Sequence, residues 1–408
     1  MKSTVFILMD AFRNDYLDRG ETPFLDKCKL KGKYIKKIIP GNGFCERAEI
    51  FTGKNSSVTG YFTAIGLDKG KSPYKNFAWI LSLLSFITNI FKYRIIDKII
   101  RRLLWIVISK TKHPMHPYRI PYEMLQYFSL TEDYIDMRQP NALGISSFFD
   151  YLTTNNIEYY YDSFTALNLP INGQDEDRLK LALNAASELK GVFFIYIGAA
   201  DVVGHQFGPN STEINHIIRR IDNQLEEFVS NFESIQPDSN YIFLGDHGMV
   251  GVEEIIDVEE IVGELSSKFN LKLGVDFLYF LDSTLMRIWF LNDNNVTIKQ
   301  AFLESNTLTS KGEFLDKENS EAYGIPSLEK LGDIVWLANP GVLICPDFFH
   351  TRSDNINGMH GYRNNINESK GFCIVNGESM TGNVINEADL TDVHDILVHC
   401  TTSRIENV

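Results

Sequence analysis

Six side chains in this sequence have the chemistry of ligands for transition-metal ions. Aspartate and histidine suit Zn²⁺, Mn²⁺ and Fe²⁺, and a pair of such ions needs about six ligands around a gap of about 4 Å. Small neighbours accompany the ligands in GAADVVGH, GDHG and MHG, and glycine lets the backbone turn sharply beside a site. We therefore predict a centre for two divalent ions, zinc first, with manganese or iron as alternatives. Its ligands would be Asp10, Asp201, His205, Asp246, His247 and His360.

Apolar runs precede most of these side chains. The runs TVFILMD, GVFFIYIGAAD and NYIFLGDHG begin at residues 4, 191 and 240, and continuous apolar runs are typical of central strands in a parallel sheet. Helical patterns at 175–190 and 213–232 lie between them. This alternation predicts a doubly wound, mostly parallel α/β fold with functional groups at the carboxyl ends of its strands. Each acid or imidazole alone is equally well explained as a cap or surface group, but their joint placement favours one site.

Several motifs along the chain resemble those of one enzyme superfamily. DVVGHQFGPNS (201–211) is similar to D-x-x-G-H-x-x-G-P-x-S, and GDHGM (245–249) is similar to S-D-H-G-M with glycine in place of serine. ILMDAFRNDYL (7–17), FTGKNSSVTG (51–60) and MHGY (359–362) resemble its first metal-binding strand end, the segment after its nucleophile and its final histidine motif. The chain thus resembles the alkaline phosphatase superfamily, most closely its nucleotide pyrophosphatase/phosphodiesterase branch.

The resemblance implies an alkaline phosphatase-like fold and a hydrolase that uses two divalent ions. Asp201, His205 and His360 would hold one ion. The other three predicted ligands would hold the second ion, and the nucleophile would bridge the two.

The position that carries the nucleophilic hydroxyl in that family is a glycine here. Counting back ten residues from Gly53 reaches Gly43, and the expected phosphoryl-binding asparagine is Ala64. A thiolate at Cys45 could act as nucleophile or metal ligand, although a free cysteine is most often a small buried residue. Alternatively, a metal-bound water attacks the phosphorus and Gly43 leaves room for it. A third interpretation is a site that binds phosphorylated ligands without turnover.

The residues around this glycine have further candidate roles. Arg47 could clamp a phosphate through its fork of N–H donors, and a salt bridge to Glu46 or Glu49 on a helix surface is an equally good explanation. Arg47 is therefore a candidate catalytic residue together with the neighbouring cysteine, and Gly43 and Phe44 are candidates for substrate binding.

Two segments interrupt the α/β pattern. Residues 76–139 begin with a long apolar, helical run and form a predicted helical insertion, and residues 256–339 combine strands and helices into a predicted small α+β cap. The alkaline phosphatase-like core is then assigned to 1–75, 140–255 and 340–408.

The first insertion is strongly basic as well as apolar. Residues 92–112 carry seven Lys/Arg against one Asp, in a chain with a net charge of −14. Isoleucine and leucine recur at helical spacing between the cations, which is typical of a helix in a membrane interface facing anionic headgroups. Charged and polar interruptions make a membrane span a poor interpretation. A lid over the active site, or a dimer face, would explain 76–112 as well as peripheral membrane contact does, and each favours a substrate with an apolar part.

Composition limits the class of partner and the compartment. The negative net charge argues against nucleic acid as a partner, because nucleic-acid binding needs a basic face. The five cysteines are widely spaced without a CxxC pair, which is typical of a reducing compartment. The apolar run before Asp10 is too short for a signal-peptide core. We expect a cytoplasmic protein, with membrane association through 76–112 as the alternative.

These observations predict a two-metal phosphohydrolase that cleaves a phosphodiester or pyrophosphate bond. Candidate substrates are nucleotides, nucleotide-sugars and lipid-linked phosphates. Two other functions would use the same ligand set: a phospho-group transferase of the same superfamily, and a non-catalytic, metal-containing binder of phosphorylated ligands.

Overall fold

The computed structural model describes residues 2–91, 94–133, 135–161, 175–292, 296–377 and 382–402. The chain divides into two compact units, each built from segments far apart in the sequence. The first unit comprises 1–59, 136–252 and 356–408, and the second comprises 60–135 and 253–355.

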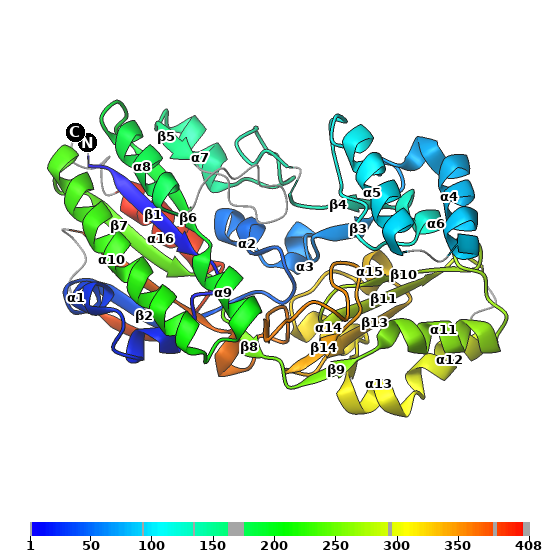
Figure 1. The fold of residues 1–408 in the computed structure, drawn as a ribbon. Helices are drawn as coiled ribbons and strands as arrows, with labels where there is room; N and C mark the ends of the chain where they lie inside the picture. Colours follow the sequence, from blue (N-terminus) through cyan, green and yellow to red (C-terminus); the bar gives the residue numbers. More distant parts are fainter. Residues whose placement is uncertain are drawn as a thin grey trace. The chain divides into compact units, whose positions relative to one another are not determined.

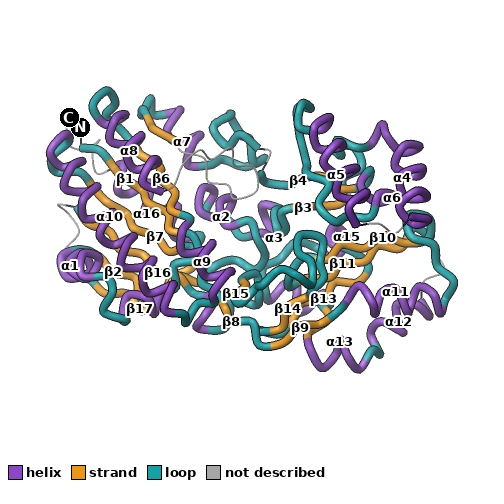
Figure 2. Tube along the Cα trace, viewed as in Figure 1, coloured by secondary structure: helices purple, strands orange, loops and turns teal. Residues whose placement is uncertain are grey.

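The first unit is organised around a seven-stranded sheet (Figures 1 and 2). The strand order is β17-β2-β16-β7-β1-β6-β5. The central β1 pairs in parallel with β6 and β7, β5 is parallel to β6 and β17 to β2, and only β16 runs antiparallel to its neighbours β7 and β2. The predicted mostly parallel α/β sheet is therefore confirmed. The strands are β1 (Thr4–Met9), β2 (Lys33–Ile39), β5 (Tyr159–Tyr161), β6 (Val192–Ile197), β7 (Asn240–Gly245), β16 (Gly371–Asn376) and β17 (Val384–Asp389).

Helices cover both faces of this sheet because the central strands are apolar on both sides. One face packs against α1 (Pro23–Lys31), α8 (Asp175–Ala186), α9 (Ala199–Phe207) and α10 (Thr212–Ile235) in one core cluster. The other face packs against α2 (Glu46–Thr52), α7 (Phe148–Thr154) and α16 (Asp392–Thr402), with Phe51 of α2 against Phe6 and Phe194 of the strands. Burying each such ring contributes on the order of 2–3 kcal/mol, so the sheet is held rigidly between two helical layers. The short α3 (Ser56–Thr59) and a 3-10 helix at Asn14–Asp18 complete the described helices near the amino-terminal strands.

A buried carboxylate joins two of these helices. Asp222 of α10 is almost fully buried and accepts hydrogen bonds from the backbone N–H groups of Phe24 and Leu25, at 2.8 and 2.9 Å. These N–H groups belong to the first turn of α1, where no backbone carbonyl of the helix can accept from them. Asp222 therefore satisfies the start of α1 from a neighbouring helix.

Replacing Asp222 by Ala should lower the free energy of unfolding by about 2 kcal/mol, because two buried donors lose their acceptor. Chemical denaturation measures this change. The matched control is Glu226→Ala one turn further along α10, whose exposed carboxylate pairs with Lys27. An exposed pair of this kind contributes at most about 1 kcal/mol, so equal losses in the two variants would contradict the capping role.

The second unit is an α+β assembly. Its antiparallel sheet has the order β10-β11-β13-β12, beside the pairs β14-β9 and β3-β4. The strands are β3 (Ile65–Leu67), β4 (Phe128–Leu130), β9 (Glu254–Ile256), β10 (Phe277–Leu281), β11 (Leu285–Phe290), β12 (Gly312–Phe314), β13 (Ile334–Ala338) and β14 (Val342–Ile344). The helices are α4 (Ala78–Phe91), α5 (Arg94–Ile108), α6 (Tyr122–Leu125), α11 (Val258–Lys268), α12 (Val296–Leu303), α13 (Asn306–Lys311), α14 (Lys317–Ala322) and α15 (Leu328–Leu331).

The compact units begin and end at other residues than the sequence patterns indicate. Residues 76–139 and 256–339 fall almost entirely in one unit, together with 60–75 and 340–355. Two non-local strand pairs explain this: β3 pairs with β4, and β9 pairs with β14. Within the described ranges, no helix combines the length and the apolar character needed to cross a bilayer.

Candidate metal centre

The register of the central strands brings the predicted ligands to one edge of the first unit's sheet. Met9, the last residue of β1, lies opposite Ile197 of β6 and Gly245 of β7. Asp10 and the Asp246–His247 pair therefore leave the sheet at the same level. Helix α9 starts just after β6 (Figure 1). It carries Asp201 and His205 one turn apart, so that both side chains share one face of the helix.

Three of the predicted ligands form a first group. The Asp201 Oδ1 atom lies 3.1 Å from His205 Nε2 and 3.7 Å from His360 Nε2. These three atoms are mutually close enough to share one metal ion. His360 follows β15 (Gly358–Met359), which pairs with β8 (Val250–Gly251), and so reaches this group from the last third of the sequence.

The other three predicted ligands form a second group. The His247 Nε2 atom lies 3.1 Å from Asp10 Oδ1 and 3.9 Å from Asp246 Oδ1. Backbone N–H groups of Ala11 and His247 donate to the Asp246 Oδ1 atom at 3.2 and 2.8 Å. The hydroxyl of Tyr196 donates to the second oxygen of Asp10. Each carboxylate is therefore held in a fixed orientation by a protein donor.

Backbone carbonyls orient two of the three imidazoles. The Nδ1 atoms of His205 and His247 each lie 2.8 Å from a carbonyl oxygen, of Gly358 and Gly248 respectively. Because a carbonyl only accepts, Nδ1 must carry a proton, so in the neutral ring the Nε2 lone pair faces the carboxylates. Metal-binding histidines characteristically have this arrangement. A lone pair facing a carboxylate at 3.1 Å is repulsive unless a proton or a metal ion lies between them. The donor set therefore fits a metal ion, which would replace the proton that the carboxylates otherwise hold on these rings.

Two further atoms support the presence of a metal site. Asp201 Oδ1 and His360 Nδ1 are buried and have no hydrogen-bond partner among the described residues. A buried polar atom without a partner costs roughly 1–3 kcal/mol. The carboxylate oxygen at the centre of the first group is thus left for a ligand that the protein itself does not supply.

The electrostatics of the site reflect the crowding of like charges. Burial raises the pKa of Asp246 well above its ordinary value, and Asp10 and Glu46 nearby raise it further. Burial alone would lower the pKa of His247, but the surrounding carboxylates outweigh it and raise that pKa well above its usual value. For His360, burial and the other two imidazoles together hold the pKa well below its usual value. Bound cations would relieve the repulsion between the carboxylates.

The two groups are adjacent. The rings of His247 and His360 stack with their centroids 4.3 Å apart, and the rings of His205 and His360 are 5.2 Å apart. All six side chains named from the sequence therefore lie together at the carboxyl edge of the sheet, which is the geometry that a two-ion centre needs.

Glu46 is a seventh side chain of the site, and the sequence interpretation did not include it. Its carboxylate lies within 4.8 Å of a ring nitrogen of both His247 and His360. Burial raises the pKa of this carboxyl group. Acids are common in the first turn of a helix because the helix dipole stabilises them there. The sequence analysis therefore considered Glu46 only as a surface partner of Arg47. Its place directly after the expected nucleophile segment was the one available signal.

The candidate substrate and nucleophile residues lie around α2. Gly43 has φ = 105°, a conformation that is strained for any residue with a Cβ, so a hydroxyl could not be added there without moving the loop. The ring of Phe44 packs edge-on against His360, with centroids 5.6 Å apart. Cys45 is the buried N-cap residue of α2 and belongs to none of the ligand groups, and Arg47 is partly buried on the same helix.

Gly245, which replaces the serine of the related motif, has a steric explanation. A Cβ at this position would lie 2.2 Å from the carbonyl oxygen of Phe12 and 3.0 Å from the ring of Phe372. Contacts this short do not occur for real Cβ atoms, so the close packing of β7 requires glycine immediately before Asp246.

Comparison with protein families matches residues 4–363 to the type I phosphodiesterase / nucleotide pyrophosphatase model. The chain belongs to this family. The match includes all seven side chains of the site, and the resemblance to the alkaline phosphatase superfamily is confirmed.

Curated proteins match parts of the chain. An uncharacterised pyrophosphatase/phosphodiesterase of Schizosaccharomyces pombe is 25% identical over 254 residues, which are 57% of this chain and 46% of that protein. The alkaline phosphatase PafA of Elizabethkingia meningoseptica is 33% identical over 93 residues, which are 20% of this chain and 17% of that enzyme. The matched region thus spans about half or less of these relatives.

Solved structures share the fold over nearly the whole chain. Human ectonucleotide pyrophosphatase / phosphodiesterase 5 superposes with a TM-score of 0.70 at 15% identity, covering 98% of this chain and 95% of that one. A murine counterpart, an inactive form in complex with AMP, gives a TM-score of 0.67 at 16% identity with the same coverages. These likenesses confirm the predicted alkaline phosphatase-like architecture.

Proposed function

We propose that this chain is a metal-dependent phosphohydrolase that cleaves a phosphodiester or pyrophosphate bond. The observation that carries the proposal is the pair of adjacent ligand groups whose histidine Nε2 atoms are turned toward carboxylates by backbone carbonyls. Family membership supports the class of bond. Candidate substrates are nucleotides, nucleotide-sugars and lipid-linked phosphates, and the AMP complex of the murine neighbour favours a nucleotide.

The two groups would hold one divalent ion each. Asp201, His205 and His360 would bind the first, and Asp10, Asp246 and His247 the second. Zinc suits these nitrogen and oxygen donors, and manganese or iron would also suit them. When bound, the ions would polarise the phosphoryl oxygens and stabilise the charge that develops on the leaving oxygen.

We propose that Glu46 takes up the chemistry left open by the absent hydroxyl. A cavity of about 10 Å³ is bordered by Gly43, Glu46, His247 and His360, and a space of this size holds about one water molecule. A water there would attack phosphorus through its oxygen while Glu46 accepts its proton. The bond to the leaving oxygen breaks, and that oxygen is then protonated from Glu46 or solvent. The Gly43 backbone, without a side chain, leaves the space open.

The test begins with removal of metals by a chelator and reloading with zinc, manganese, iron or magnesium. Hydrolysis of bis-p-nitrophenyl phosphate, p-nitrophenyl phosphate and a nucleotide-sugar should return only with divalent ions, with the diester or pyrophosphate preferred. Tight AMP binding by the reloaded protein without any turnover would instead identify a binder. Phosphorylated glycerol, formed when glycerol is added, would identify a transferase.

Cys45 is the other nucleophile that the sequence suggests, but it is not among the residues that line the cavity or form the ligand groups. We therefore expect Cys45→Ala to keep kcat/KM within about threefold of wild type, the range expected when no catalytic group is lost. Cys28→Ala, which removes a buried cysteine of α1 in the same unit, is the matched control for folding. A loss of a hundredfold or more in Cys45→Ala alone would make Cys45 the nucleophile.

A further inference from the structure

Helices α4 and α5 of the second unit each present apolar side chains to solvent. Trp79, Leu83 and Phe86 recur every three or four residues on α4, and Trp79 is 71% exposed. On α5, the same spacing places exposed apolar side chains from one end to the other, and Ile95 is 74% exposed. We call this set the outer apolar face. It consists of Trp79, Leu83, Phe86, Ile95, Ile99, Leu103, Ile106 and Val107.

Positive charge lies beside this face. Lys98 and Arg102 are exposed on α5, one turn apart, and Lys110 and Lys112 are exposed just beyond its end. Neither Lys98 nor Arg102 forms an ion pair within the ranges that the structure describes. The whole chain carries a net charge of −14, so this cluster of cations has the opposite sign to the protein as a whole. Such a cluster beside apolar side chains is complementary to a negatively charged partner.

The opposite side of α5 is fixed to the rest of the unit. Arg101 pairs with Asp97 at 2.9 Å and donates to the carbonyl oxygens of Pro117 and Ile120, at 3.2 and 2.9 Å. The hydroxyl of Tyr122 in α6 donates to Asp97 at 2.7 Å. The charged pair therefore faces inward, contrary to the usual arrangement of a surface helix, and the apolar side chains face outward.

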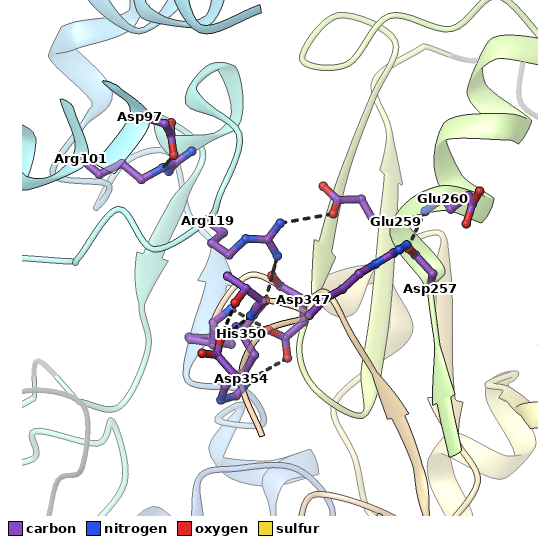
Figure 3. Close-up of polar contacts among 12 residues, drawn as sticks. Asp97, Arg101, Arg119, Asp257, Glu259, Glu260, Asp347, His350 and Asp354 are labelled. Atoms are coloured by element: carbon purple, nitrogen blue, oxygen red, sulfur yellow. Dashed lines mark hydrogen bonds and ion pairs between the residues drawn. The ribbon is translucent and has the colours of Figure 1, made fainter. Parts of the chain in front are cut away.

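Residues 117–120, whose carbonyl oxygens accept from Arg101, are held in turn by contacts of Arg119. Arg119 donates to the carbonyl oxygen of His350 at 2.9 Å, contacts the carbonyl oxygen of Asp347 and lies 3.5 Å from the carboxylate of Glu259 (Figure 3). Figure 3 also shows the Asp97–Arg101 pair on its own helix above this cluster. The helix is thus presented on a fixed support, with its orientation set by polar contacts on the inner side.

We propose that the outer apolar face docks on the surface of an anionic lipid bilayer. A helix with an apolar face bordered by Lys and Arg lies in the plane of such an interface, with its apolar side chains in the acyl boundary and its cations at the headgroups. The exposed apolar side chains of α4 form a second stripe of the same kind, and the aromatic ring of Trp79 suits the headgroup level. In a two-fold contact with a second copy the cations of the two faces would oppose each other, so they favour an anionic surface. The proposal is independent of the enzymatic activity.

The test is co-sedimentation of the full chain with vesicles of phosphatidylglycerol and phosphatidylcholine, compared with vesicles of phosphatidylcholine alone. We expect binding to the anionic vesicles, and we expect added salt to weaken it because the charges are screened. Lys98→Glu/Arg102→Glu should lower the affinity by at least about tenfold, since each cation near an anionic surface contributes on the order of 1 kcal/mol. Ile99→Glu/Leu103→Glu should abolish the binding.

Matched controls use exposed side chains of the first unit. Leu181→Glu and Lys180→Glu on α8 make the same chemical changes away from the outer apolar face and should bind as wild type does. Circular dichroism and thermal melting check that each variant is folded. The fluorescence of Trp79 adds a local readout: vesicles should shift the emission of wild type to shorter wavelength, and the shift should be smaller in Trp79→Phe.

Three results would overturn the proposal. One is the absence of binding to anionic vesicles at low salt. Another is equal binding by wild type and by folded Lys98→Glu/Arg102→Glu. The third is a dimer, measured by light scattering, that Ile99→Glu/Leu103→Glu converts to monomer while vesicles fail to bind either form, because the face would then be covered by a second copy.

Discussion

Replacing Asp246 by Asn is expected to lower kcat/KM by a factor on the order of a thousand or more, because one of the two proposed ions loses a charged ligand. The amide oxygen of Asn can still accept from the backbone N–H groups of Ala11 and His247, which donate to Asp246 Oδ1, so the fold should be retained. Metal analysis of the purified variant should show the loss of about one ion per chain relative to wild type.

Thermal unfolding gives a second readout of the same variant. Without metal, Asp246→Asn should unfold no earlier than wild type, because a neutral amide replaces a carboxyl group whose ionised form is disfavoured by burial and by the neighbouring carboxylates. With metal added, its transition temperature should rise less than that of wild type, since ligand binding stabilises the folded state. Asp18→Asn, at an exposed carboxylate of the same unit, should match wild type throughout. Full metal content and full activity in Asp246→Asn would refute the two-ion centre.

Replacing Glu46 by Gln should lower kcat by roughly 10² to 10⁴, the range that a positioned general base contributes. The amide keeps the size of the side chain but cannot accept the proton of an attacking water. We expect KM and metal content to change little, because Glu46 is assigned to the proton and not to the ions. Steady-state kinetics on the metal-loaded enzyme, together with metal analysis, measures both.

The control for Glu46→Gln is Glu213→Gln, which makes the same change in the first turn of α10 at an exposed position. A fall in bound metal that parallels the fall in kcat would reassign Glu46 as a ligand. Unchanged kcat in a folded, metal-loaded Glu46→Gln would remove it from the mechanism and return attention to Cys45.

The six predicted ligands could be found from the sequence because their positions follow from local patterns. Asp10 and Asp246 directly follow apolar runs, and Asp201 and His205 are one turn apart on a helix that follows another such run. A parallel sheet aligns the ends of its strands, so the sequence pattern alone predicts that these groups meet. His360 follows no such run, and only its motif placed it with the others.

Other features depend on contacts that no local pattern reports. Glu46 enters the site because α2 packs on the sheet face that α7 and α16 also cover, and because its first turn lies near His247 and His360. Residues 60–75 belong to the second unit because β3 pairs with β4, which lies about sixty residues later in the chain. A local sequence pattern does not report such a non-local pairing. The direction of the apolar residues of α5 likewise depends on the inward hydrogen bonds of Arg101.

The position of β16 has a consequence for how the protein is made. This strand lies between β7 and β2 and bonds to both, yet it is synthesised long after them, and His360 emerges shortly before it. On the ribosome, β2 and β17 therefore have no place in the central sheet until residues 371–376 have left the exit tunnel. The six predicted ligands consequently cannot all meet before the His360 segment has been made, and the sheet that holds them is completed only after residues 371–376.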